Sequence, residues 1–232
     1  MDYIESKSTE RKFKELRELG QKLGIPIFES FIEFEVTMPN GEVVHHHKQR
    51  SHSWVRNAYN LMMSQLGGIN GSDVTFGAGL ISIKTTNGTI GHSISILFLE
   101  GWGGDVENSD SGYRGAAGIA TKGIIVGSSA QVESFEDYNL ITPITNGSGA
   151  GQLHYQEGVV PAKSYDIPSK TYSVAHVRYM NNNSAGNVLV NEIALVADLQ
   201  SAVSRDHLGA TITIPATGQL KVTYTISLVF PA

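Results

Sequence analysis

Cysteine is absent from the sequence, and charged residues are sparse. With no cysteine among 232 residues, disulfides, thiolate metal sites and a cysteine nucleophile are all excluded. The 17 Lys and Arg residues are outnumbered by 22 Asp and Glu residues, which gives a formal net charge of -5. A nucleic-acid binder needs a basic face that releases phosphate counterions, so we expect no specific nucleic-acid partner.

Long apolar runs are missing as well. Residues 1–23 are rich in charge and lack the continuous apolar stretch of a signal peptide. No later segment approaches the ~20 apolar residues of a membrane helix. We therefore expect a soluble chain that is not exported through a signal peptide and has no membrane partner.

A pattern of helical spacing lies near the N-terminus. Four apolar residues recur three or four positions apart, namely Phe13, Leu16, Leu19 and Leu23. Gly24 followed by Pro26 is typical of a helix stop, because glycine accepts the left-handed C-terminal position and proline cannot continue the helix. The pattern predicts an amphipathic helix over residues 9–23, whose apolar stripe packs on the body of the protein or on another copy of the chain.

Residues 1–27 are therefore assigned to an N-terminal helix or arm, and residues 28–232 to a β-rich sandwich domain. Apolar and acidic residues alternate from Phe28 to Met38, which predicts a half-buried strand, and a turn at Asn40-Gly41 leads into a second strand over Val43 to Gln49. A second helix is expected near residues 53–66. The apolar face predicted for it consists of Val55, Tyr59, Met62 and Leu66.

Beyond residue 70, short β-rich runs are separated by Gly, Asn, Ser and Thr. The strongest runs are Leu80–Thr85, Thr89–Leu99, Gly123–Val126, Thr171–Met180, Val188–Ala197, Ala210–Ile214 and Gln219–Phe230. Asn87-Gly88 is a typical hairpin turn, and Ser134 to Tyr138 has the spacing of one capped helical turn. This organisation predicts a mainly β fold, a β-sandwich or jelly roll with an N-terminal helix and a second short helix.

No pattern identifies a catalytic residue, and the Gly-x-Ser-x-Gly elbow of serine hydrolases is missing. A histidine run at His45, His46 and His47 precedes His52. On a strand His45 and His47 share a face, which is the minimum for an imidazole metal site. Because the spacing places no carboxylate or fourth ligand beside them, we assign neither a metal nor a cofactor, and metal binding by these histidines stays open.

Glycine-rich loops carry aromatic and acidic side chains. Trp102, Tyr113, Tyr138 and Tyr155 are able to stack on sugar rings, although aromatic residues in such loops also anchor contacts between subunits. Loop acids such as Glu136 offer carboxylates for glycoside hydrolysis, but closeness in sequence does not define the facing pair that this chemistry needs. Glycan recognition and glycan hydrolysis therefore stay open as alternatives.

Short motifs along the chain resemble those of virion structural proteins of tailed bacteriophages. They are SHSWVRN at 51–57, GIIVG at 123–127, SFEDYNL at 134–140, PI at 143–144, GSGAGQLHY at 147–155, VRYMNNN at 177–183, VNEIAL at 190–195, SRD at 204–206 and GQLKVTYTI at 218–226. The resemblance covers roughly residues 50–230 and consists of turns and strand patterns. Ala185-Gly186 and the histidine run depart from it, so no functional residue is carried over.

The resemblance implies a β-sandwich subunit assembled in copies on a phage particle, in the head, neck or tail. Its expected partners are itself, with a trimer favoured, and other virion proteins, and its expected location is the virion. Assembly or ligand contacts are assigned to Phe13, Leu16, Leu19, Leu23, Trp102 and Tyr113. The alternatives are a tail-associated module that binds a receptor or a host glycan, and a polysaccharide depolymerase.

Overall fold

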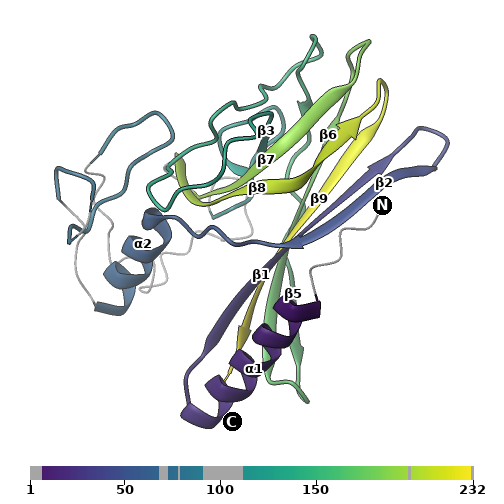
Figure 1. The fold of residues 1–232 in the computed structure, drawn as a ribbon. Coiled ribbons are helices and arrows are strands. Elements are labelled where there is room, and N and C mark those ends of the chain that lie inside the picture. Colours follow the sequence, from purple (N-terminus) through teal and green to yellow (C-terminus); the bar gives the residue numbers. More distant parts are fainter. Residues whose placement is uncertain (1–6, 68–72, 78, 91–111, 198–199, 231–232) are drawn as a thin grey trace.

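The computed structural model describes residues 7–67, 73–77, 79–90, 112–197 and 200–230. The fold is mainly β, with two antiparallel sheets packed face to face and two helices, as Figure 1 shows. The predicted mainly β class with an N-terminal helix and a second short helix is confirmed, and the architecture is that of a β-sandwich.

The larger sheet contains six strands, in the order β2-β1-β9-β6-β4, with β5 also paired to β6. Its strands are β1 (Ile27–Thr37), β2 (Val43–Arg50), β4 (His154–Tyr155), β5 (Ala162–Asp166), β6 (Thr171–Asn181) and β9 (Gln219–Val229). The predicted hairpin of β1 and β2 forms, with Phe34 opposite His47, and Gly41 in its turn has a φ of 85°. That left-handed conformation explains why glycine follows Asn40 there.

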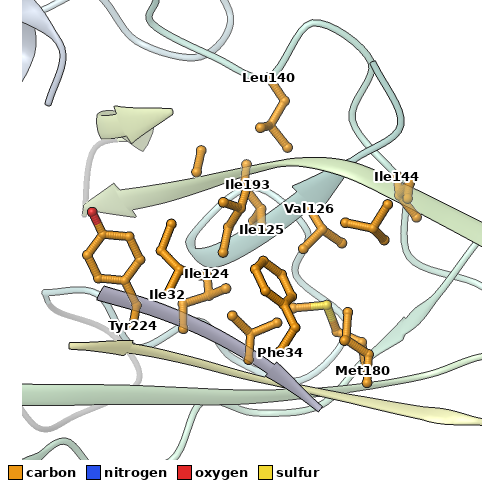
Figure 2. Packing of buried hydrophobic residues seen from close by; sticks show 14 of the residues in the cluster. Ile32, Phe34, Ile124, Ile125, Val126, Leu140, Ile144, Met180, Ile193 and Tyr224 are labelled. Atoms are coloured by element: carbon orange, nitrogen blue, oxygen red, sulfur yellow. The ribbon is translucent and has the colours of Figure 1, made fainter. Parts of the chain in front are cut away.

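The smaller sheet has the order β3-β7-β8. Its strands are β3 (Gly123–Gly127), β7 (Val188–Ala197) and β8 (Ser201–Ile214). Between the two sheets lies the hydrophobic core shown in Figure 2, where Ile32, Phe34 and Met180 of the larger sheet face Ile124, Val126 and Ile193 of the smaller one. Alternating residues of β1 and β9 supply the larger sheet's side of this core, whereas β3 and β7 carry consecutive buried residues because both of their faces are covered.

The two helices are α1 (Lys7–Leu23) and α2 (Arg56–Gly67). Helix α1 ends as predicted, because the N–H of Ile25 donates to the carbonyl of Gly20 across Gly24, whose φ is 70°. Figure 1 shows strands β1, β9 and β5 continuing below the smaller sheet, in the part of the molecule where α1 lies against β1. No helix within the described ranges is long and apolar enough to cross a bilayer.

The face that α2 buries differs from the one predicted. Its buried residues include Asn57, Asn60 and Ser64, whereas Tyr59 and Leu66 are exposed. The amide of Asn57 donates to the carbonyls of Lys84 and Ala202, and that of Asn60 donates to the carbonyl of Ser82. Buried amides with such partners are satisfied, so α2 packs on the body through these polar groups together with Ala58 and Leu61, and leaves Tyr59 and Leu66 outside.

Some of the shorter predicted elements are wrong. The run Leu80–Thr85 forms no strand beyond a single bridge from Lys84 to Ile90, although Gly88 takes a φ of 87° at the expected turn. Residues 134–138 form a turn instead of a helix, closed by the N–H of Ser134 on the carboxylate of Asp137 at 2.7 Å. Most of the run Thr89–Leu99 lies outside the described residues.

Candidate functional site

A pocket of about 170 Å³ lies where α1, the start of β1 and α2 meet. We call it the α1–α2 pocket. Its apolar walls come from Phe13 of α1, Phe28 of β1, Trp54 of the segment before α2, and Tyr59 and Met62 of α2. Its polar lining is Glu29, Ser30, Arg50 and Ser51. Aromatic walls of this kind are typical of sites that receive an apolar side chain.

A buried ion pair forms the polar base of the pocket. Arg50 and Glu29 are both buried and hydrogen-bonded to one another, and Arg17 of α1 also donates to Glu29 at 2.7 Å. The guanidinium of Arg50 is stacked between the rings of Phe13 and Phe31, at 3.9 and 4.4 Å from their centroids. Burial alone would lower the pKa of Arg50, but the hydrogen bonds to its carboxylate partners raise that pKa above its usual value. These contacts fix α1 onto the sheet.

The other polar groups of the pocket bond within the protein. Trp54 donates its Nε1–H to Ser30 at 3.0 Å, and Tyr224 donates its hydroxyl to Ser51 at 2.7 Å. Ser51 in turn donates to the carboxylate of Asp206 at 2.8 Å. A side chain or ligand group that enters the pocket would therefore make mainly apolar contacts with its walls.

An exposed apolar stripe on α1 continues from the pocket. Phe13 is half-buried as a wall of the pocket, whereas Leu16, Leu19 and Leu23 are 43%, 52% and 62% exposed. We call these three residues the leucine stripe. Single exposed leucines are ordinary on protein surfaces, but three at helical spacing beside an aromatic pocket form a patch of the kind found at interaction sites.

Of the two remaining contact residues predicted from the sequence, Tyr113 is not part of this surface. Trp102 lies outside the described residues. Tyr113 packs against the core and meets the ring of His176 edge to face, with centroids 5.3 Å apart. Burial raises the pKa of Tyr113 to about 12 and lowers that of His176 to about 4. Both rings are therefore neutral at pH 7.

The histidine run is divided between the two faces of β2. His46 bonds to Glu33 at 2.7 Å, while His47 is buried and bonds to Gln49 at 2.9 Å. His52 lies beyond the strand and is exposed. Within the part of the chain that the structure describes, no three His, Asp or Glu side chains are grouped so that they could hold a metal ion.

Loop residues considered for sugar chemistry are held by internal contacts. Tyr155 is fully buried and donates its hydroxyl to the carbonyl of Ile144 at 2.9 Å. Glu136 pairs with Arg56, and Asp137 with the buried Arg205 at 2.7 Å. Tyr138 lies under the ammonium of Lys84, 3.8 Å from the ring centroid. These contacts fasten the loops to the sandwich.

Two buried arginines hold the glycine-rich loops, and sequence reasoning did not single them out. Arg178 of β6 donates to five backbone carbonyls, those of Ala116, Ile119, Lys122, Ile124 and Gln156. Arg205 of β8 bonds to the buried Glu192, whose carboxylate also accepts the N–H of Ile141 and Thr142. The sequence signal that could have identified them is an arginine at a position where the strand pattern predicts a buried side chain.

Comparison with known proteins identifies no relative: no family model, no curated protein and no solved structure matches the chain.

Proposed function

We propose that this protein is a structural subunit of a tailed-bacteriophage particle, in the head, neck or tail, and that its task is to assemble with copies of itself and with other virion proteins. The sequence motifs described above support the phage setting. The observation that carries the assembly role is the leucine stripe next to the α1–α2 pocket. Apolar side chains left in water at such a surface gain about 25 cal/mol per Å² when a partner covers them, before the costs of association are subtracted.

The rigid body of the molecule supports the same role. Arg178 and Arg205 fasten irregular segments to the sandwich through buried hydrogen bonds, so those segments present a fixed surface. A fixed surface loses little conformational entropy on binding, which favours association through shape complementarity.

Two measurements test the proposal. Sedimentation equilibrium of the purified chain gives the copy number, for which the phage resemblance favours three. An antibody raised against the chain is then applied to intact particles under the electron microscope. Labelling at a discrete position supports the proposal, whereas a monomeric chain that is missing from particles overturns it.

A depression of about 340 Å³ at the opposite end of the larger sheet favours a second candidate, recognition of a neutral glycan. Its polar lining consists of uncharged side chains, those of Thr37, Asn181, Asn183, Thr217 and Gln219. Amide groups both donate and accept hydrogen bonds, which suits the hydroxyls of a sugar. Retention of a glycan from an array, lost in the Asn183→Ala variant, would support this role, and no retention by the parent chain would refute it.

A further inference from the structure

The leucine stripe has the spacing of a helix-pairing seam. Leu16, Leu19 and Leu23 follow one another at intervals of three and four residues, which is the repeat that keeps one side of a helix against a partner helix. Phe13, Arg17 and Gly20 lie on the side of α1 that faces its own sheet, where Phe13 stacks on Arg50 and Arg17 bonds to Glu29. The seam is therefore a second side of α1, separate from the side that docks it.

The exposed area around the seam is a large part of one side of a small protein interface. Phe28 and Tyr59, which line the adjoining α1–α2 pocket with Phe13, are 50% and 49% exposed. Taking about 200 Å² for each large side chain when fully exposed, these two residues and the leucine stripe present about 500 Å². Specific complexes bury about 600–1,000 Å² on each partner, so a second copy offering the same surface supplies more than half of the area required.

The charges beside the seam favour one orientation of that second copy. Glu15 and Lys22 are two turns apart, so they flank the seam on the same side, and both are exposed. An antiparallel pair of α1 helices brings Glu15 within about one turn of the partner's Lys22, and Lys22 within about one turn of the partner's Glu15. A parallel arrangement instead sets this side of each seam against the opposite side of the other, so Glu15 and Lys22 of the two copies do not meet.

We infer that α1 packs antiparallel against α1 of a second copy, across a two-fold axis that passes between Leu16 and Leu19. In this register Leu16 faces the partner's Leu19, Leu19 faces the partner's Leu16, and Leu23 reaches the mouth of the partner's α1–α2 pocket beside the partner's Phe13. The inference rests on the proposed self-assembly and names its contact. Because a two-fold contact is isologous, it predicts dimers, or hexamers if a threefold contact exists elsewhere on the molecule.

Cysteine cross-linking tests the orientation, since the parent chain has no cysteine of its own. Full-length Leu16→Cys and Leu19→Cys variants with tags of different mass are oxidised separately and as a mixture. The antiparallel register predicts a dominant product that combines both masses, because facing Cα atoms lie near the ~4.4–6.8 Å that a disulfide spans. The Leu189→Cys variant, at a site on β7 that is 48% exposed, is the matched control and should remain uncross-linked.

A charge exchange provides an independent readout. The Glu15→Lys and Lys22→Glu variants should each dimerise about tenfold more weakly, because each places like charges across both ends of the seam. A mixture of the two should recover the parent affinity, since opposite charges then face each other at both places. Unchanged affinity in the single variants, or no recovery on mixing, overturns the antiparallel pairing.

The outcomes separate this inference from the function on which it rests. Cross-links that join only variants of the same mass, together with a trimeric mass, would overturn the antiparallel pair and leave self-assembly intact. A chain that stays monomeric at about 100 µM, well above the dissociation constants of specific complexes, would overturn both. Circular dichroism of each variant shows whether the fold is retained. The mixed charge variants change only exposed residues, so their affinity tests the pairing without altering a buried side chain.

Discussion

Replacing Arg178 by methionine should weaken the fold more than any surface substitution. Arg178 is 1% exposed, and its guanidinium reaches five backbone carbonyls at distances from 2.6 to 3.0 Å. Burial lowers its pKa to about 10, so the group is still protonated at pH 7. Methionine fills a similar volume but donates no hydrogen bond, which leaves buried carbonyls without their donor.

The expected loss is about 3–5 kcal/mol of unfolding free energy, the usual cost of removing one partner from a buried charged network. Arg178→Lys keeps the charge but has three donors on a single nitrogen in place of a planar fork, so its loss should be smaller. Arg11→Met is the matched control, because Arg11 is exposed and pairs with Glu15 on the helix surface. A surface pair of this kind contributes no more than about 1 kcal/mol.

Urea denaturation followed by circular dichroism measures these losses. With a slope of about 2–3 kcal/mol per M, the midpoint of Arg178→Met should fall by more than about 1 M. Amide hydrogen exchange should also become faster at Gly118 and Ile119, which belong to the segment that the guanidinium holds. A midpoint within about 0.3 M of the parent, with unchanged exchange at these amides, would refute the assigned role.

Four other substitutions probe the pH dependence, a close packing contact with its control, and a turn. Burial raises the pKa of Asp206 to about 6, above its unfolded value of 3.8. The protonated carboxyl therefore adds about 2–3 kcal/mol to the unfolding free energy below about pH 4, and this contribution is lost as the pH rises through 6. Asp206→Asn should flatten this dependence of the unfolding free energy on pH, measured by urea titrations at several pH values. Gly115→Ala brings a Cβ into the carbonyl oxygen of Lys122 and should lower the thermal midpoint by several degrees, whereas Gly186→Ala, with open space around it, should leave that midpoint nearly unchanged. Gly88→Val forces a β-branched residue to a φ of 87° and should cost about 1 kcal/mol or more in urea denaturation, so an unchanged midpoint would speak against the turn.

The parts of the fold that were predicted correctly are those where one side-chain period dominates. Val188–Ala197 is apolar except for Asn191 and Glu192 and forms β7 with the same limits, while the helical spacing from Phe13 to Leu23 forms α1. In both cases the local pattern of apolar residues is sufficient to predict the element, because the spacing of these residues and their burial favour the same secondary structure. The apolar stripe was predicted to pack on the body or on another copy, and in the structure Phe13 packs on the body whereas Leu16, Leu19 and Leu23 are exposed.

Prediction failed where buried polar groups take the place of apolar ones. The first half of β8 was missed because Ser204, Arg205 and Asp206 are buried there, with Arg205 and Asp206 in hydrogen-bond networks. The buried side of α2 was misassigned because Asn57 and Asn60 bond to carbonyls from distant segments. Such partners are set by tertiary structure, so no local pattern of the sequence reveals them.

Sedimentation equilibrium of the full-length chain beside its Leu19→Glu variant tests the central claim most directly. The claim is that copies of the chain associate through the leucine stripe and the α1–α2 pocket. It predicts that the parent sediments as an oligomer, and that a glutamate in the seam raises the dissociation constant at least about 100-fold while circular dichroism is unchanged. A parent chain that sediments as a monomer, or a variant that associates as tightly as the parent, would contradict the claim.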